Sequence, residues 1–141
     1  MGNAIARNGD TLTQSVANSH IHRERWVSGD EFTSGYWTSA SSISATINGT
    51  ITRSSGSVYA NGILVCTKDD RTKETDTHNT ISSPYRYDGG RHTNNTNGSI
   101  SGGSSTVFIG GKSVARKSDS VTNHAGGSTT IAGGSNNVFV G

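Results

Sequence analysis

The 141 residues are enough for one small domain, and Gly, Ser, Thr and Asn make up about half of them. Only 29% of the residues are hydrophobic, and the formal net charge is +2. This composition excludes a membrane-spanning helix, a helical bundle and a disulfide framework, because apolar runs are short, helix-favouring residues are scarce and Cys66 is the single cysteine.

Two classes of chain remain, a disordered one and an all-β protein of short strands joined by Gly- and Asn-rich turns. The small net charge favours the all-β class. The sequence has no basic run, which speaks against a nucleic-acid partner. No apolar segment follows Met1, so no secretory signal peptide is predicted.

In chain order, residues 3–10 predict a strand that ends in an acidic turn at Asp10. The first arm, residues 11–55, is the longest and holds the aromatic residues Trp26, Phe32, Tyr36 and Trp37. These aromatic residues predict a local mini-core, with a carbohydrate platform as the alternative. Residues 43–52 alternate apolar and polar around an Asn-Gly pair, which predicts an extra hairpin.

One pattern then recurs: a Gly-Ser turn, a short apolar strand, and an Asn-Gly or Gly-containing hairpin turn. Its copies are Gly56–Gly62, Gly103–Gly111 and Gly134–Gly141. A second strand and an acidic turn follow, in residues 63–70, in residues 112–119 and, at the start of the chain, in residues 3–10. Each unit is therefore strand, tight hairpin, strand and acidic turn, at Asp70, Asp119 and Asp10.

Because the chain begins in the second half of a unit and ends in the first half of one, residues 138–140 can pair with residues 4–6. This pairing closes a ring of three hairpins with pseudo-threefold symmetry and protects strand edges. The arms between the hairpins are residues 11–55, 71–102 and 120–133. The sequence predicts one domain, 1–141, with an extra β insertion at about 23–55.

The repeated residues resemble the PAAR-repeat proteins. The resemblance rests on Gly-Ser-x-x-Val-Phe-x-Gly-Gly at 103–111, Val-Ala-Arg-x-x-Asp at 114–119, His124 and a final Gly-Ser-x-x-Val-Phe-x-Gly at 134–141. It covers residues 3–10, 56–78 and 102–141. The Pro of the motif name is absent, and the middle copy, Leu64-Val65-Cys66-Thr67, is degenerate.

The resemblance implies a cone-shaped β domain that caps a trimeric β-helical spike, in a phage tail baseplate or a type VI secretion needle. It also implies a metal ion near the apex, held mainly by histidines. At least one histidine follows the acidic turn in each arm. The candidate ligands are His124, His78, His22, His20 and His92.

Imidazoles that converge on one axis suit zinc or iron, and zinc is the first expectation. Such a metal would cross-link three loops that share almost no core. Cys66 aligns with Ala6 and Ala115, at a small inward position, where a free cysteine is typically a buried apolar residue. Whether it is a ligand stays open at this stage.

We therefore predict a monomeric structural tip, one per spike trimer, that sharpens the spike and makes transient contact with the host outer membrane. The sequence has no Gly-x-Ser-x-Gly elbow and no His-Glu-x-x-His, so no enzyme is predicted. Two alternatives remain: a receptor- or glycan-binding tail-tip module that uses the aromatic residues of the first arm, and a self-trimeric β-solenoid adhesin fragment.

Overall fold

The computed structural model describes residues 2–88 and 97–141, and this part of the chain consists of strands, turns and bends without a helix. The all-β class predicted from composition is confirmed. No helix in the described ranges is long and apolar enough to cross a bilayer. The strands are β1 (Asn3–Ala4), β2 (Ser15–Val27), β3 (Tyr36–Thr52), β4 (Tyr59–Ala60), β5 (Ile63–Leu64), β6 (Arg71–Thr77), β7 (Tyr85–Tyr87), β8 (Ser99–Ile100), β9 (Phe108–Ile109), β10 (Lys112–Ser113), β11 (Ser120–Thr122), β12 (Ser128–Thr130) and β13 (Phe139–Val140).

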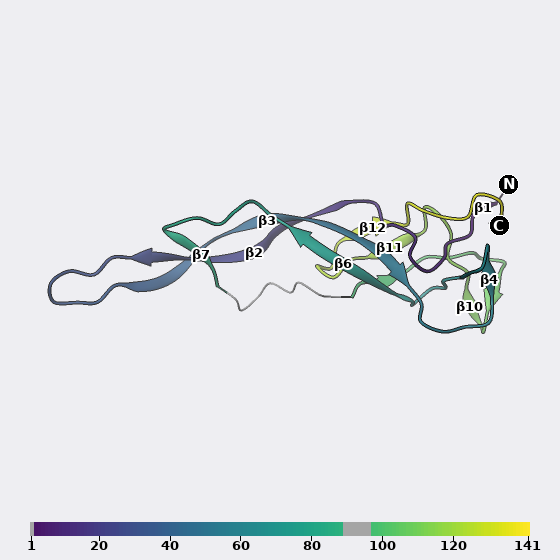
Figure 1. Cartoon of the computed structure of the whole chain (residues 1–141), viewed down its shortest axis with the longest axis horizontal. Helices are drawn as coiled ribbons and strands as arrows, with labels where there is room; N and C mark the ends of the chain where they lie inside the picture. The colour runs from purple at the N-terminus through teal and green to yellow at the C-terminus, as the bar shows by residue number, and fades with distance from the viewer. Residues whose placement is uncertain (1, 89–96) are drawn as a thin grey trace.

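Three two-stranded sheets form one end of the molecule, and both chain ends lie there (Figure 1). They are the hairpins β4–β5 and β9–β10 and the pair β1–β13. In the pair β1–β13, Asn3 lies opposite Val140 and Ala4 opposite Phe139. The predicted closure of the ring through the chain ends is therefore confirmed.

The other strands form an antiparallel sheet in the order β12-β11-β8-β6-β3-β2-β7. The sheet is curled around the body, and its long β2–β3 hairpin projects away from the chain ends and forms the far end of the molecule (Figure 1). The loop between β2 and β3 therefore lies farthest from the three small hairpins.

A closed ring of backbone hydrogen bonds lies at the centre of the three repeated units. Ala6 N–H donates to Ala115 O at 2.9 Å, Cys66 N–H to Ala6 O at 3.0 Å, and Ala115 N–H to Cys66 O at 3.0 Å. All three residues are fully buried. Only small side chains fit where three strands approach one axis this closely, and the ring shows that the pseudo-threefold symmetry extends to the backbone.

The three acidic turns share one construction. Each Asp carboxylate accepts a hydrogen bond from the backbone N–H three residues earlier, at 2.7, 2.8 and 2.8 Å, in the pairs Arg7–Asp10, Thr67–Asp70 and Arg116–Asp119. The residue before each Asp has a positive φ: 89° at Gly9, 73° at Asp69 and 75° at Ser118. Glycine adopts a positive φ without cost, but Asp69 and Ser118 do not, so in those two turns the carboxylate holds a backbone conformation that the local residue disfavours.

Two small apolar clusters stack along this axis. One contains the central ring and a layer of branched residues: Leu12, Ile51, Ile100, Val121 and Ile131. The other lies between the hairpins and contains Ile5, Ala60, Val65 and Val114, with four half-buried aliphatic residues packed against them. Backbone ladders and buried side-chain hydrogen bonds supply the remaining order, as expected for a chain with few apolar residues.

The hairpin predicted around Asn48-Gly49 is wrong. Both residues lie inside the continuous strand β3, and the reversal of the chain falls between Val27 and Tyr36. Gly49 pairs with Glu74, and a Cβ on Gly49 would lie 2.5 Å from the carbonyl oxygen of Lys73. The glycine is required by the close approach of β6, so the Asn-Gly pair is not a turn here.

The aromatic residues of the first arm form a smaller cluster than predicted. Trp26 and Trp37 are cross-strand partners in a T-shaped pair, with ring centroids 5.3 Å apart. Phe32 in the loop is 86% exposed and Tyr36 is 59% exposed. Among the described residues the arm is one sheet layer thick at this point, and the Arg86 guanidinium lies over the Trp37 ring at 3.9 Å.

Candidate metal centre

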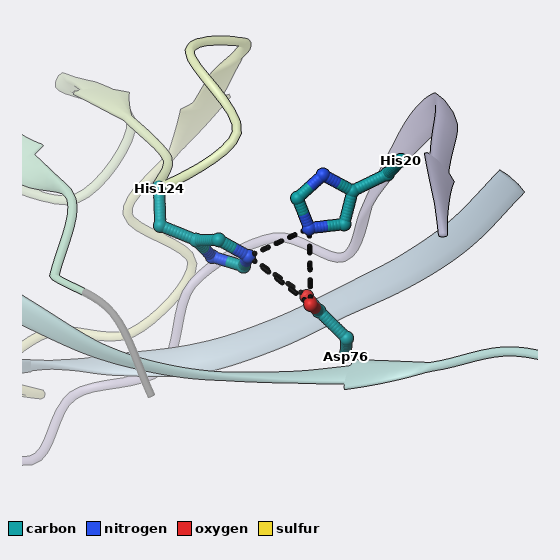
Figure 2. Close-up of side chains that lie close together, drawn as sticks. All are labelled: His20, Asp76 and His124. Atoms are coloured by element: carbon teal, nitrogen blue, oxygen red, sulfur yellow. Dashed lines mark hydrogen bonds and ion pairs between the residues drawn. The ribbon is translucent and has the colours of Figure 1, made fainter. Parts of the chain in front are cut away.

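Three side chains from separate parts of the chain converge on one point (Figure 2). His20 comes from β2, Asp76 from β6 and His124 from the turn that follows β11. The two imidazole Nε2 atoms are 3.2 Å apart. Asp76 Oδ2 lies 3.1 Å from Nε2 of His20, and Asp76 Oδ1 lies 3.0 Å from Nε2 of His124.

An irregularity in β2 directs His20 toward this point. Ala17 pairs with Ala45 and Ile21 with Ile43, so three residues of β2 lie opposite the single residue Ser44 of β3. Ser19 takes up the distortion with a φ of 54°. Bulges of this kind redirect a side chain that the regular alternation would place elsewhere.

The alternation of β6 places two carboxylates on the inner face. Thr72 and Glu74 are buried while Lys73 and Thr75 are exposed, and Asp76 follows on the inner side. Glu74 Oε2 accepts hydrogen bonds from the backbone N–H of Gly98 at 2.9 Å and from the Thr72 hydroxyl. These two hydrogen bonds fix the position of the Glu74 carboxylate, whose other oxygen faces His124.

His124 stands in a tight turn that Asn123 organises. The Asn123 side-chain oxygen accepts hydrogen bonds from Ala125 N–H at 3.1 Å and from Gly127 N–H at 2.9 Å. Both the backbone N–H and Nδ1 of His124 lie 3.3 Å from Glu74 Oε1. This contact orients the ring and leaves Nε2 to face His20 and Asp76.

The charges of this cluster are almost completely withdrawn from water. The side chains of Glu74 and Asp76 are 0% exposed, that of His124 is 1% exposed and that of His20 is 13% exposed. Two buried carboxylates on one imidazole are costly without a compensating positive charge. A divalent cation or a protonated imidazole would supply it.

The donor atoms fit a first-row metal ion. In a tetrahedral zinc site with bonds of about 2.0–2.1 Å, ligand atoms lie about 3.3 Å from one another. The contacts between His20, His124 and Asp76 are 3.0–3.2 Å, close to that separation. A carboxylate on the far nitrogen of a ligand histidine, as Glu74 is on His124, is a common outer partner in such sites.

The structure brings together two of the five candidate histidines, His20 and His124, and joins them with Asp76. His22 lies in a second register shift of β2 against β3, between Ile21 and Arg23, and its Nδ1 is 3.1 Å from the Ser42 hydroxyl. The Nδ1 of His78 lies 2.8 Å from the carbonyl oxygen of Asn79. His92 lies outside the described residues. Which histidines bind metal stays a prediction.

Sequence reasoning missed both carboxylates. The available signal was the strand Thr72-Lys73-Glu74-Thr75-Asp76, in which Glu74 and Asp76 share one face with a small Thr. Histidine and cysteine are not the only metal ligands, so carboxylates at alternate positions of a strand are also candidates.

Cys66 lies in the central ring of the hairpins with Ala6 and Ala115, and the described group of possible ligands does not include it. Burial raises the pKa of its thiol to about 12, and the nearby Asp70 carboxylate adds to the increase. A thiol that stays protonated is a poor metal ligand. Its position agrees with the alignment to Ala6 and Ala115.

Residues 90–141 match the family model described as the PAAR motif. No curated protein matches the sequence. The matched segment includes the hairpin β9–β10, the turn that carries His124, and the closing strand β13.

Proposed function

Because the chain carries a PAAR motif, which indicates the spike tip of a phage tail or type VI secretion apparatus, we propose that this protein is a metal-bound cap on a trimeric β-helical spike. The resemblance found in the sequence is confirmed by the family match. One observation carries the metal-binding part of the proposal: two buried carboxylates and two imidazoles converge where β2, β6 and the turn after β11 meet.

His20 Nε2, His124 Nε2 and a carboxylate oxygen of Asp76 would hold the ion, and Glu74 would orient His124. When bound, the metal supplies cross-links among three segments that share little apolar core. Its binding free energy becomes stability of the fold. Zinc is the first candidate because mixed nitrogen and oxygen ligands with tetrahedral spacing suit it, and iron is the second.

The three hairpins at the end with the chain termini are the proposed docking surface. Tyr59, Phe108 and Phe139 occupy equivalent places in the three hairpins and are 58%, 54% and 56% exposed. Three equivalent aromatic residues about one axis match a partner with true threefold symmetry, and each can meet one subunit of a trimer. Docking at this end points the β2–β3 hairpin away from the spike.

In this role the protein is a mechanical part without turnover. It would transmit force to a small leading structure and make brief contact with the host outer membrane. We place it at the tip of a phage tail baseplate, with the type VI secretion spike as the other location. We expect a monomer in solution, whereas a self-trimer would support the adhesin alternative.

The first test is the metal content of the purified, untagged chain by plasma mass spectrometry. We expect about one equivalent of zinc or iron, lost in Asp76→Ala and in His124→Ala. His22→Ala is the matched control, because it removes an imidazole from the same strand outside the group of three. A chain without metal that keeps its fold in chelator would contradict the metal-bound cap.

A further inference from the structure

In the described part of the chain, the outer end of the β2–β3 hairpin is a single sheet layer of three strands, β3-β2-β7, whose side chains are exposed or half-buried. Arg25 lies opposite Thr38 on one side and Tyr85 on the other, and Arg23 lies opposite Tyr87. Residues directly opposite one another point to the same face. One face therefore carries Arg23, Arg25, Tyr36, Tyr85 and Tyr87, which we call the tyrosine–arginine face.

The two faces of this layer differ in charge. On the tyrosine–arginine face, the remaining positions of the paired segments are Val27, Thr38 and Ala40, so the face has no carboxylate. The opposite face carries Glu24, paired to Arg86 at 2.5 Å, and the packed Trp26–Trp37 rings. Both faces thus carry arginine and aromatic rings, but Arg86 on the opposite face is paired with Glu24 and lies over the Trp37 ring at 3.9 Å, whereas the paired segments of the tyrosine–arginine face hold no carboxylate.

The tyrosine–arginine face is partly organised in advance. The Arg23 guanidinium lies over the Tyr85 ring at 4.3 Å, and its Nε and Nη2 atoms donate to Ser41 O and Ser41 Oγ, both at 2.8 Å. Arg25 is exposed, Tyr36 is 59% exposed and Tyr87 is 37% exposed. In the described part of the chain, no ion pair links Arg23 or Arg25 to a carboxylate.

The geometry points to a binding site for an acidic polysaccharide on this face. Guanidinium groups recognise carboxylates through paired hydrogen bonds, and they do so better than ammonium groups. Tyrosine rings offer rigid surfaces for the C–H face of a sugar ring, and their hydroxyls can bond to sugar hydroxyls. A polymer that presents a carboxylate on each sugar ring matches the interleaved tyrosines and arginines.

Other polyanions fit this face less well. A nucleic-acid backbone needs a longer cationic track than two arginines, and the whole chain has a net charge of only +2. A lipid surface would be met first by the loop that follows β2, where Asp30 and Glu31 lie beside Phe32. An anionic membrane would repel these carboxylates. A carbohydrate chain can instead lie along the side of the hairpin.

The test uses the full purified chain and purified oligogalacturonate, a polymer of carboxylated sugars, with binding followed by calorimetry. Arg25→Ala and Tyr36→Ala should each weaken binding about ten-fold or more. Arg86→Ala is the matched control: it removes the same charge from the opposite face and should change affinity less than about two-fold. Neutral dextran should not bind.

Equal losses from Arg25→Ala and Arg86→Ala would show general charge attraction and overturn the proposal. Absence of oligogalacturonate binding would also overturn it, as would preferential binding to anionic vesicles or to an oligodeoxythymidylate. Circular dichroism and metal content of each variant confirm the fold independently of binding. The proposal does not depend on the metal-bound cap, because the tyrosine–arginine face lies outside the group of His20, Asp76 and His124.

Discussion

Arg53 gives Asp70 the guanidinium partner that the degenerate middle repeat lacks. In the other two units, Arg7 and Arg116 pair with the Asp three residues later, at 3.3 and 2.9 Å. The middle unit has Thr67 at that position, and Arg53, just after the end of β3, reaches the Asp70 carboxylate at 2.9 Å and the Thr67 hydroxyl at 2.9 Å. The same charge pair is thus rebuilt from a distant part of the chain.

If Arg53 replaces the missing arginine of the middle unit, an arginine at position 67 should restore the stability lost in Arg53→Ala. Arg53→Ala should lower the free energy of unfolding by about 1–2 kcal/mol, because Asp70 loses a half-buried, charge-assisted partner. Adding Thr67→Arg to that variant places an arginine where the other two units have one, and should restore most of the loss. Urea denaturation measures both. Arg71→Ala, an exposed arginine on β6, is the control, and failure of rescue would show that Arg53 acts through other contacts.

Cys66 should be inert to thiol reagents in the folded protein. Its side chain is fully buried, and burial raises the pKa of the thiol from 9.0 to about 12. Ellman's reagent at pH 8 should therefore react only when the chain is unfolded in denaturant. Cys66→Ala should keep its full metal content. Rapid labelling of the folded chain, or metal loss in that variant, would place the thiol at the metal instead.

The same thiol predicts a pH dependence of stability. Since the folded pKa lies above the unfolded one, the contribution is complete below about pH 9 and is lost as the pH rises toward 12. Within that window the free energy of unfolding should fall by about 1 kcal/mol per pH unit more in the native chain than in Cys66→Ala. Denaturation at pH 8, 9.5 and 10.5 checks this, and parallel curves for the two proteins would contradict it.

Glu74 should change the affinity of the proposed metal site without being a ligand itself. Its two oxygens accept hydrogen bonds from Gly98 N–H and from His124, so Glu74→Gln turns one acceptor into a donor that faces another donor. Metal affinity, measured by competition with a chromogenic chelator, should drop about 10- to 100-fold. Thr75→Gln, on the outer face of the same strand, is the control. Unchanged affinity in Glu74→Gln would limit Glu74 to a structural role.

Gly49→Ala should destabilise the chain by about 1–3 kcal/mol, because the new Cβ would lie 2.5 Å from the Lys73 carbonyl oxygen and force β6 away from β3. Thermal unfolding of the metal-free protein measures the loss. Thr38→Ala, at an exposed place on the same strand, should have little effect. A neutral Gly49→Ala would mean that β3 and β6 are not so closely packed.

Repeated local patterns explain how much of the fold could be predicted. Each Gly-Ser turn, short apolar strand and acidic turn is encoded within about 16 residues, and three copies in the same order imply a ring. The Asn61-Gly62 pair does form the β4–β5 turn, with φ values of 56° and 77°. The identical pair at Asn48-Gly49 does not, because β6 pairs along this part of β3 and keeps it extended.

The amino-acid sequence by itself determined the all-β class, the threefold repetition and the resemblance to PAAR-repeat proteins, and it offered five histidines as candidate ligands. Only the tertiary structure decided that Asp76 and Glu74 lie beside His20 and His124, and that Arg53 is the ion-pair partner of Asp70. These partners lie 17 to 104 residues apart, and no local pattern records such distances. Curling of the sheet brings β2, β6 and the turn after β11 together. Because the carboxylates of Glu74 and Asp76 are then buried, they require a positive charge nearby.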